Sequence, residues 1–267
     1  MSLSYPQRIV CLTEETTEAL YLMGEQDRIV GVSGYTVRPA IARKEKPKVS
    51  AFTSAKIDKI LDLKPDLVLG FSDMQADIAA ELVRAGVEVH IFNQRSIHEI
   101  LTMLQTLGSL IGEPIKANAL IEQFDAHLHK IKQQASELTH RPRVYFEEWY
   151  EPHICGIQWV SELLELAGGE DCFAHMAKNS LGKDRIIADH ADIINAQPDI
   201  IIGSWCGRKF KAEKVREREG WQDIPAVKNN QLFEIKSADI LQPGPACLTD
   251  GVSQLHDIIR QWIPDAK

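Results

Sequence analysis

The sequence contains few cysteines, and their spacing does not indicate a shared structural role. Five cysteines occur in 267 residues. The number is odd and no Cys-x-x-Cys pair is present, which disfavours a disulfide framework and a structural zinc site. The nine histidines show neither His-x-x-x-His nor His-Glu-x-x-His spacing. We expect no metal centre of these kinds, although a site built from ligands scattered along the chain stays open.

Glycine-rich phosphate loops are also missing. Neither Gly-x-Gly-x-x-Gly nor Gly-x-x-x-x-Gly-Lys-Ser/Thr occurs, so a dinucleotide site or a P-loop has no support. No nucleophile, base and orienting group can be recognised as a set. We therefore expect a binding protein with no required cofactor, not an enzyme.

Long apolar runs and a basic excess are absent as well. No window approaches the roughly 18 uninterrupted apolar residues of a membrane-spanning helix, and no basic stretch followed by an apolar run opens the chain. We expect a cytoplasmic protein as the sequence stands, or a periplasmic one if an export signal has been removed. The net charge of −8 disfavours nucleic-acid binding, which needs a basic face. We expect a monomer.

What the sequence does contain is an internal repeat. Residues 59–70 (KILDLKPDLVLG) return as residues 192–203 (DIINAQPDIIIG). In both copies a short helix is expected to end before Pro-Asp, because proline restricts the preceding residue to extended backbone. The apolar run that follows is typical of a strand buried on both faces of a parallel sheet, and a glycine closes it.

Strands and helices alternate around each copy. Strands are expected at 8–11, 87–92 and 143–146, and helices at 16–24, 74–85, 97–111 and 161–168, with Ser161 as N-cap and Gly168 as the left-handed stop. This order predicts an α/β fold of two Rossmann-like lobes with parallel sheets. Apolar residues spaced by three and four predict one long amphipathic helix between them. We expect lobes at 1–112 and 141–267, a connecting helix at 113–140, and a ligand cleft between the lobes.

These features together resemble a known family, the class III substrate-binding proteins of ABC importers, the vitamin B12 and ferric-siderophore type. The resemblance covers residues 8–263, and its most specific parts are residues 8–24, 30–35 (VGVSGY), 57–69 and 244–251 (GPACLTDG). It is closest to the cobalamin-binding branch. By position, Tyr35, Phe52 and Phe71 match aromatic residues that line the corrin pocket there, and flat aromatic faces suit a broad macrocycle. Phe52 and Phe71 could instead be core residues.

Ligands of open α/β sheets bind beyond the carboxyl ends of the strands. There we expect loops that carry two glutamate doublets, one in each lobe. The doublets would favour a cationic or amide-rich ligand or a metal, or they could cap helices or face solvent. The complete set of expected ligand contacts is Glu14, Glu15, Tyr35, Phe52, Phe71, Ser72, Asp73, Glu147, Glu148, Trp149, Tyr150, Trp159, Trp205, Cys206, Lys209 and Gln242.

The resemblance also implies a permease partner. In this family an acidic residue seven positions before each Pro-Asp proline pairs with permease arginines. That position holds Asp58 in the first lobe but Ala191 in the second, where Asp192 or Asp189 could substitute. Our hypothesis is a protein that binds cobalamin or a related corrinoid. The alternatives are a binder of haem, another iron chelate or a metal ion, and a cytoplasmic carrier or sensor that does not dock to a permease.

Overall fold

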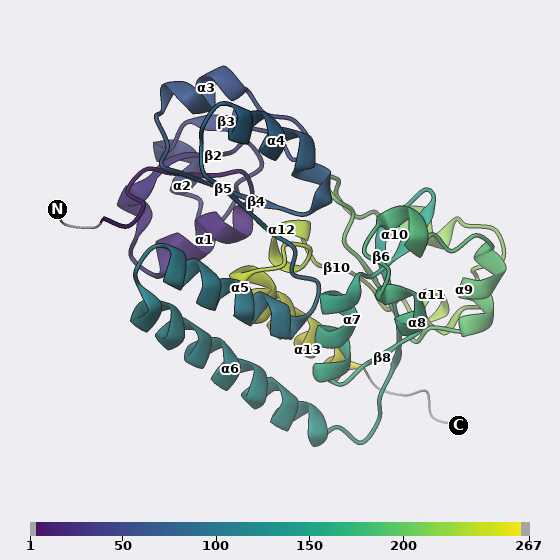
Figure 1. Cartoon of the computed structure of the whole chain (residues 1–267). Helices are drawn as coiled ribbons and strands as arrows, with labels where there is room; N and C mark the ends of the chain where they lie inside the picture. The colour runs from purple at the N-terminus through teal and green to yellow at the C-terminus, as the bar shows by residue number, and fades with distance from the viewer. Residues whose placement is uncertain (1–3, 263–267) are drawn as a thin grey trace. The chain divides into compact units, whose positions relative to one another are not determined.

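Two five-stranded sheets organise the computed structural model, which describes residues 4–262 (Figure 1). The first sheet has the order β3-β2-β1-β4-β5, and every neighbouring pair in it is parallel. Its strands are β1 (Ile9–Cys11), β2 (Ile29–Ser33), β3 (Lys48–Ser50), β4 (Leu67–Phe71) and β5 (Val89–Phe92). The chain leaves β1 toward one edge and returns to its other side with β4, which is the strand order of a Rossmann-like half.

The second sheet has the order β10-β9-β6-β7, with β8 also paired to β6. Its strands are β6 (Arg143–Tyr150), β7 (His153–Cys155), β8 (Glu170–Asp171), β9 (Ile200–Gly203) and β10 (Leu232–Glu234). The pairs of β6 with β9 and β8, and of β9 with β10, are parallel, whereas β7 is antiparallel to β6. The predicted α/β fold with parallel sheets is confirmed, with one antiparallel strand added to the second sheet.

Helices connect the strands of both sheets. In the first half they are α1 (Glu14–Leu22), η1 (Gln26–Arg28), α2 (Ala42–Glu45), α3 (Ile57–Asp62), η2 (Asp73–Gln75), α4 (Ala76–Arg84), α5 (Ile97–Leu110) and α6 (Pro114–Ser136). In the second half they are α7 (Gln158–Leu166), α8 (Ala174–Ala177), η3 (Gly182–Arg185), α9 (His190–Ala196), α10 (Ala212–Arg216), α11 (Pro225–Lys228), α12 (Ser237–Ile240), a π-helical turn η4 (Cys247–Gly251) and α13 (Val252–Gln261). None of the helices within residues 4–262 has the length and apolar character needed to cross a membrane.

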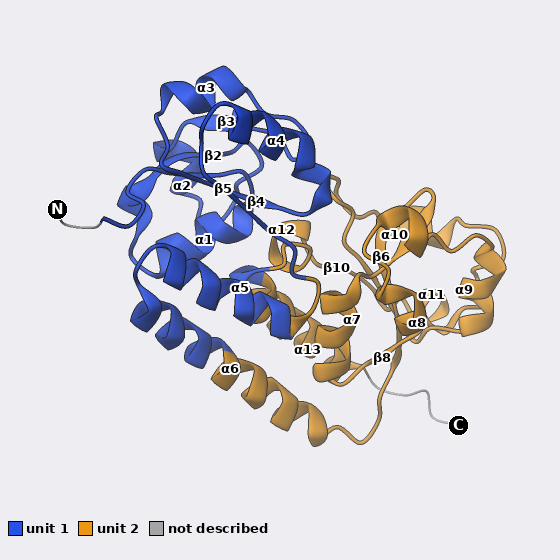
Figure 2. Ribbon diagram, viewed as in Figure 1, with its two compact units in different colours: residues 1–94, 98–124, 244–246 blue, residues 95–97, 125–243, 247–267 orange. Residues whose placement is uncertain are grey.

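The chain divides into two compact units (Figure 2). Unit 1 comprises residues 1–94, 98–124 and 244–246, and unit 2 comprises residues 95–97, 125–243 and 247–267. The expected long helix is confirmed as α6, which has 23 residues and ends at Ser136. The domain boundaries at 112 and 140 and the ligand cleft stay predictions. Residues 1–3 and 263–267, at the ends of the predicted lobes and of the resemblance, lie outside the described part.

The Pro-Asp repeat makes the same connection in both units. The Asp66 carboxylate accepts hydrogen bonds from the backbone nitrogens of Gln7 and Arg8, at 2.7 and 2.8 Å, just before β1. Asp199 accepts one from the backbone nitrogen of Arg143, at 2.8 Å, where β6 begins. Asp66 precedes β4 and fixes the start of β1, which pairs with β4. Asp199 precedes β9 and likewise fixes the start of β6, which pairs with β9.

Each sheet is buried by its own apolar cluster. In unit 1 the cluster includes Val10, Val68 and Leu82, all at most 1% exposed. In unit 2 it contains Tyr145, Ile201 and Trp221, exposed to the same small extent. The nearly continuous apolar runs of β4 and β9 follow from this burial on both faces.

Three local expectations need comment. Gly168 has φ +103° and ends α7 in the left-handed region, as expected. Ser161 is not an N-cap, because α7 begins at Gln158 after Ile157 and Ser161 is buried inside its first turns. The helix after β1 begins at Glu14, two residues earlier than expected.

Candidate ligand-binding site

The expected contacts of unit 1 gather at one edge of its sheet. They follow the carboxyl ends of β1, β2, β3 and β4, which are adjacent in the sheet order β3-β2-β1-β4. The strand order reverses between β1 and β4, and ligands of such sheets bind at this reversal. The residues concerned are Glu14, Glu15, Tyr35, Phe52, Ser72 and Asp73.

Glu14 and Glu15 lie in the first turn of α1 and are 6% and 1% exposed. The Thr13 hydroxyl donates to Glu15 Oε1 at 2.7 Å. A Cβ placed on Gly244 would lie 2.4 Å from the Cβ of Glu15, so only glycine lets that segment pack here. The doublet thus begins a helix, one of the alternatives left open by the sequence, and its carboxyl groups are buried.

Burial changes the acidity of this doublet. Burial, followed by the negative charge of Glu15, raises the pKa of Glu14 to about 8. Burial raises the pKa of Glu15 to about 7, although the hydrogen bond from Thr13 opposes the shift. Glu14 is therefore mostly protonated at neutral pH and can donate a hydrogen bond as well as accept one. Such a group suits an amide better than a cation.

The aromatic residues of unit 1 differ in availability. Tyr35 follows β2 and is 61% exposed. Phe52 follows β3 and is half-buried, and its carbonyl accepts a hydrogen bond from Gln75 Nε2 at 2.8 Å. Phe71 is the last residue of β4 and only 5% exposed, as expected for the alternative in which it is a core residue.

Ser72 has an unusual backbone at the end of β4. Its φ of +63° and ψ of 172° fall in a region that side chains rarely adopt, and the residue is 1% exposed. Its hydroxyl accepts a hydrogen bond from Met74 N at 3.3 Å, and its own nitrogen donates to the Phe92 carbonyl at 2.7 Å. These contacts on both sides hold the strained turn between β4 and η2.

In unit 2 the expected loop at residues 147–150 is a strand. The prediction was wrong because the chain turns back at Glu151–Pro152, so that β6 continues to Tyr150 and pairs with β7. Aromatic residues are enriched in strands. The run of Phe146, Trp149 and Tyr150 was therefore an available signal for this extension.

The second glutamate doublet is neutralised by two arginines. Glu147 is fully buried, and Arg218 donates to its Oε2 and Oε1 at 2.6 and 2.9 Å. Arg185 donates to Glu148 Oε2 and Oε1 at 2.7 and 3.0 Å. The arginines lie 71 and 37 positions away in sequence, so no local pattern indicated either pair. Unit 2 therefore does not present the acidic doublet that the sequence suggested.

Beside these pairs lies a stack of aromatic rings. The ring of Trp205 is centred 4.4 Å from that of Tyr150, which is centred 5.1 Å from that of Trp149. Arg208 lies over Trp149 at 5.5 Å and donates to the Tyr150 hydroxyl at 2.7 Å. Lys214 lies over Tyr150 at 5.0 Å. Trp149 and Tyr150 are half-buried and Trp205 is 3% exposed, so the first two carry the accessible aromatic surface.

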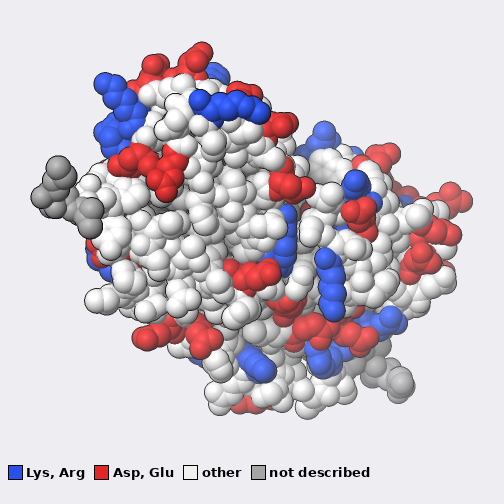
Figure 3. Space-filling model, in the orientation of Figure 1, with Lys and Arg blue, Asp and Glu red and all other residues white. Residues whose placement is uncertain are grey.

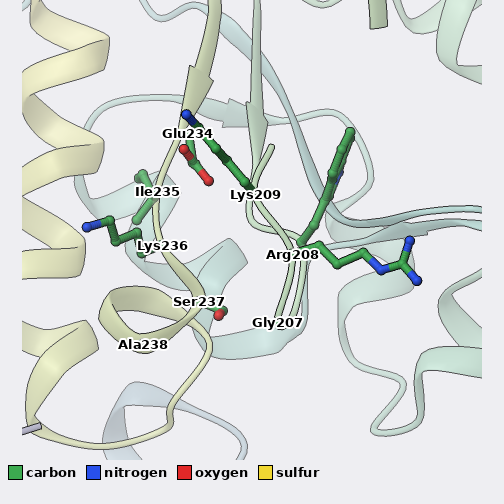
Figure 4. A pocket seen from close by; sticks show the side chains of 9 residues that line it. Gly207, Arg208, Lys209, Glu234, Ile235, Lys236, Ser237 and Ala238 are labelled. Atoms are coloured by element: carbon green, nitrogen blue, oxygen red, sulfur yellow. The ribbon is translucent and has the colours of Figure 1, made fainter. Parts of the chain in front are cut away.

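Trp205 is the one ring of this stack that lines a pocket of about 350 Å³. Figure 4 shows this pocket from close by. Trp205 forms part of its wall, together with exposed cations, and Ser237 and Glu234 also line it. Glu234 Oε1 accepts a hydrogen bond from Phe210 N at 2.9 Å. The cations are Arg208, Lys209 and Lys236. The expected contact Lys209 therefore lies at the same pocket as Trp205.

Three other expected contacts of unit 2 occupy different settings. Trp159 is 3% exposed within α7, and its indole nitrogen donates to the Ile240 carbonyl at 3.0 Å. Cys206 is exposed in the loop after β9, and Gln242 is half-buried after α12. Trp159 is thus held in the interior of unit 2, whereas Cys206 adjoins the residues that line the pocket.

The expected docking residues are both exposed. Asp58 lies in the first turn of α3, and Asp192 in the first turn of α9. Asp189 is the N-cap of α9 and accepts a hydrogen bond from Ala191 N at 2.8 Å. Asp192 therefore has the setting in unit 2 that Asp58 has in unit 1, one position further along the helix. Docking itself stays a prediction.

Neither the charge on the face shown in Figure 3 nor the metal-binding side chains within residues 4–262 indicate another ligand-binding site. On the face shown in Figure 3, acidic and basic side chains are interspersed and separated by uncharged surface. Within residues 4–262 no three side chains of the His, Cys, Asp and Glu types come together as metal ligands would.

Comparison with known proteins shows the family. The model of the periplasmic binding protein family matches residues 9–238, and the chain belongs to this family. An uncharacterised ABC transporter substrate-binding lipoprotein of Bacillus subtilis, YvrC, is 27% identical over 95% of this chain and 80% of its own length. A vitamin B12-binding protein of Vibrio campbellii is 27% identical over 89% of this chain and 84% of its own length.

A solved structure has the same fold. It is that of a possible iron-binding, periplasmic solute-binding protein of Staphylococcus epidermidis, with a TM-score of 0.82 and 24% identity over 96% of this chain and 99% of that one. At this identity the likeness concerns the fold alone. The predicted family resemblance and fold class are both confirmed.

Proposed function

We propose that this chain is the substrate-binding protein of an ABC importer and that its ligand is a corrinoid such as cobalamin. The observation that carries the proposal is the aromatic stack of Trp149, Tyr150 and Trp205 at the ends of β6 and β9. Rigid aromatic faces bury a large area at little entropic cost, which suits a broad macrocycle. The names of the two relatives, an ABC substrate-binding lipoprotein and a vitamin B12-binding protein, support the same assignment.

The proposed contacts form a smaller set than the sequence suggested. Glu147 and Glu148 are left out because they are paired with arginines, and Phe71 and Trp159 because their rings are buried within β4 and α7. Trp205 is as buried as Trp159 but is kept, because it follows the end of β9 and lines the pocket. Protonated Glu14 can donate to the carbonyl of a corrin side-chain amide. The contacts we propose are Glu14, Glu15, Tyr35, Phe52, Ser72, Asp73, Trp149, Tyr150, Trp205, Cys206, Lys209 and Gln242.

Calorimetric titration with cyanocobalamin tests the proposal, and Tyr35 offers a matched pair of variants. Tyr35→Ala removes a 61% exposed ring that follows the carboxyl end of β2, whereas Tyr5→Ala removes a 57% exposed ring that precedes the amino end of β1. We expect cyanocobalamin to bind and Tyr35→Ala to weaken it about tenfold, with Tyr5→Ala unchanged. No heat with the unaltered protein at high micromolar cyanocobalamin would remove the corrinoid from the proposal.

A second ligand class is favoured by one observation. Four cations, Arg208, Lys209, Lys214 and Lys236, lie over the aromatic stack or line the pocket beside it. Haem and many iron chelates carry carboxylates that such cations bind. Titration with haemin in parallel with cyanocobalamin separates the two classes. The site would be assigned to haem if the unaltered protein binds haemin but not cyanocobalamin, and if Arg208→Glu loses the haemin binding.

The partner and compartment follow from this proposal. An importer receives its ligand outside the cytoplasmic membrane, so the proposal favours the periplasm over the cytoplasm. Asp58 and Asp192 are the proposed docking residues, because both are exposed in the first turn of a helix. The test is co-purification with an ABC permease from the same source as this chain, which Asp58→Lys with Asp192→Lys should abolish. Unchanged co-purification of the double variant would place docking elsewhere.

A further inference from the structure

Glu147 is a buried charge placed beneath the proposed aromatic face. It is fully buried in β6, where an unpaired carboxylate would be costly. Each of its oxygens has two donors. Oε1 accepts from Trp205 Nε1 at 2.9 Å and from Arg218 at 2.9 Å, and Oε2 accepts from Arg218 at 2.6 Å and from the Tyr145 hydroxyl at 3.2 Å.

The surroundings of Glu147 keep it ionised. His153 Nδ1 lies 3.4 Å from Oε2. Burial raises the pKa of Glu147, but the nearby His153 and the hydrogen bonds from Arg218 outweigh it and leave the pKa below its usual value. A carboxylate with this many donors has one orientation, because any rotation breaks several charge-assisted hydrogen bonds at once.

Trp205 depends on this carboxylate for its orientation. Trp205 lies in the loop that follows β9. Its indole has one polar atom, Nε1, which donates its hydrogen to Glu147. The ring then packs on Tyr150 at 4.4 Å and on Phe210 at 5.1 Å. Tyr150 in turn packs on Trp149. The outer rings have anchors of their own, since Trp149 Nε1 donates to the Glu151 carbonyl at 2.8 Å and Arg208 donates to the Tyr150 hydroxyl, and Trp205 is the ring that links them to the buried carboxylate.

We propose that Glu147 is the positioning residue of the ligand face: it fixes the indole of Trp205, and through it the rings of Tyr150 and Trp149, in the arrangement that receives a planar ligand. The inference rests on the proposed function for its ligand, but the ordering of the rings can be tested without one. Glu147 then contributes to the affinity for the ligand although its carboxylate does not contact the ligand.

The decisive variant is Glu147→Gln, with Glu148→Gln as its matched control. The two glutamates are neighbours on β6, and each accepts two hydrogen bonds from a single arginine. Each substitution removes one negative charge from such a pair. Of the aromatic rings in the stack, only Trp205 donates to either carboxylate, and it donates to Glu147. Both variants should lose stability, so an effect that follows stability alone would appear in both.

The first measurement uses protein without ligand. Tryptophan is replaced with 5-fluorotryptophan, and the fluorine resonances of Trp149 and Trp205 are assigned with single Trp→Phe variants. We expect Glu147→Gln to shift or broaden both resonances and Glu148→Gln to leave both in place. Unmoved resonances in a folded Glu147→Gln protein would overturn the proposal, whatever the ligand is.

The second measurement is the affinity for cyanocobalamin at a temperature where all variants are folded. We expect Glu147→Gln to weaken binding about tenfold or more, the loss typical of one hydrogen bond to a charged group, and Glu148→Gln to leave it within about twofold. An equal loss of affinity in both variants would mean that Glu147 contributes to stability but does not position the rings. Absence of binding to the unaltered protein would refute the corrinoid, not the ordering of the rings.

A third variant covers the case in which Glu147→Gln does not fold. Trp205→Phe keeps a ring at this position and leaves the pair of Glu147 and Arg218 intact, but it removes the indole hydrogen. We expect the Trp149 resonance to broaden and the affinity for cyanocobalamin to fall as in Glu147→Gln. A sharp, unshifted Trp149 resonance in this variant would contradict the proposed route from Glu147 to the outer rings.

Discussion

Asp199 Oδ2 accepts a hydrogen bond from the backbone nitrogen of Arg143 at 2.8 Å. Arg143 is the first residue of β6, and Asp199 immediately precedes β9, the strand with which β6 pairs. The bond places the first residue of β6 beside the end of the turn that precedes β9. Asp66 and Arg8 repeat the relationship in unit 1 at the same distance.

This relationship predicts the effect of removing the aspartate. Asp199→Ala leaves the amide of Arg143 without its acceptor, and we expect the free energy of unfolding to fall by about 1–3 kcal/mol. Asp66→Ala should cost at least as much, because Asp66 accepts from two amides. Urea unfolding measures both, with exposed Asp77→Ala as control. A cost no larger than that of Asp77→Ala would contradict the role of the repeat.

Glu14 makes a pH-dependent contribution to stability. Its pKa is raised from 4.5 to about 8, so the folded state holds a proton that the unfolded state has released between these values. Stability is therefore lost as pH rises from about 4.5 to about 8, with a slope of at most about 1.4 kcal/mol per pH unit. We expect Glu14→Gln to flatten this dependence and to gain most at pH 8. The test is urea unfolding at pH 5.5, 7 and 8.

The control for this prediction is Glu81→Gln, which alters an exposed glutamate of α4. Its stability curve should run parallel to that of the unaltered protein. If the curve of Glu14→Gln is parallel as well, burial does not hold a proton on Glu14.

Ser72 stores backbone strain that glycine would relieve. Its φ of +63° and ψ of 172° belong to a region essentially reserved for glycine. We expect Ser72→Gly to be neutral or to stabilise by up to about 1 kcal/mol, and Ser72→Ala to destabilise by about 1 kcal/mol, since alanine keeps the strain and loses the bond to Met74. Thermal unfolding of the two variants gives the comparison, and an equal loss in both would argue against strain at this residue.

The glycines that close the repeat are expected to resist substitution. A Cβ on Gly203 would lie 1.9 Å from Phe210 Cδ2, and one on Gly70 would lie 2.6 Å from Gln75 Oε1. We expect Gly203→Ala and Gly70→Ala to cost about 1–3 kcal/mol by overpacking. Gly182→Ala is the control, because its nearest neighbour would be 3.6 Å away. Chemical denaturation tests all three, and a cost for Gly203→Ala as small as the control's would contradict the crowding.

Much of the fold could be predicted because its signals are local. The buried runs of β4 and β9, the prolines before them and the apolar spacing of α6 are each readable within a short window of sequence. The extension of β6 was missed because it depends on pairing with β7. Pairing partners are not written in a strand's own pattern, although the aromatic run was a signal in favour of a strand.

The candidate site could be predicted only in part. The edge of the sheet that gathers Tyr35, Phe52 and Ser72 follows from strand topology alone. The fate of the two glutamate doublets does not, because it depends on distant arginines in unit 2 and on burial in unit 1. Residue type showed that the carboxyl groups were present, but only the packing showed whether they are charged and available.

The distance in sequence between β6 and its arginines has a consequence for synthesis on the ribosome. When Glu147 is synthesised, Arg185 and Arg218 have not yet been translated. A nascent chain that stops short of them carries two carboxylates that it cannot bury without a partner. We therefore expect unit 2 to complete its sheet late in translation, and fragments that end before Arg218 to be substrates for chaperones or proteases.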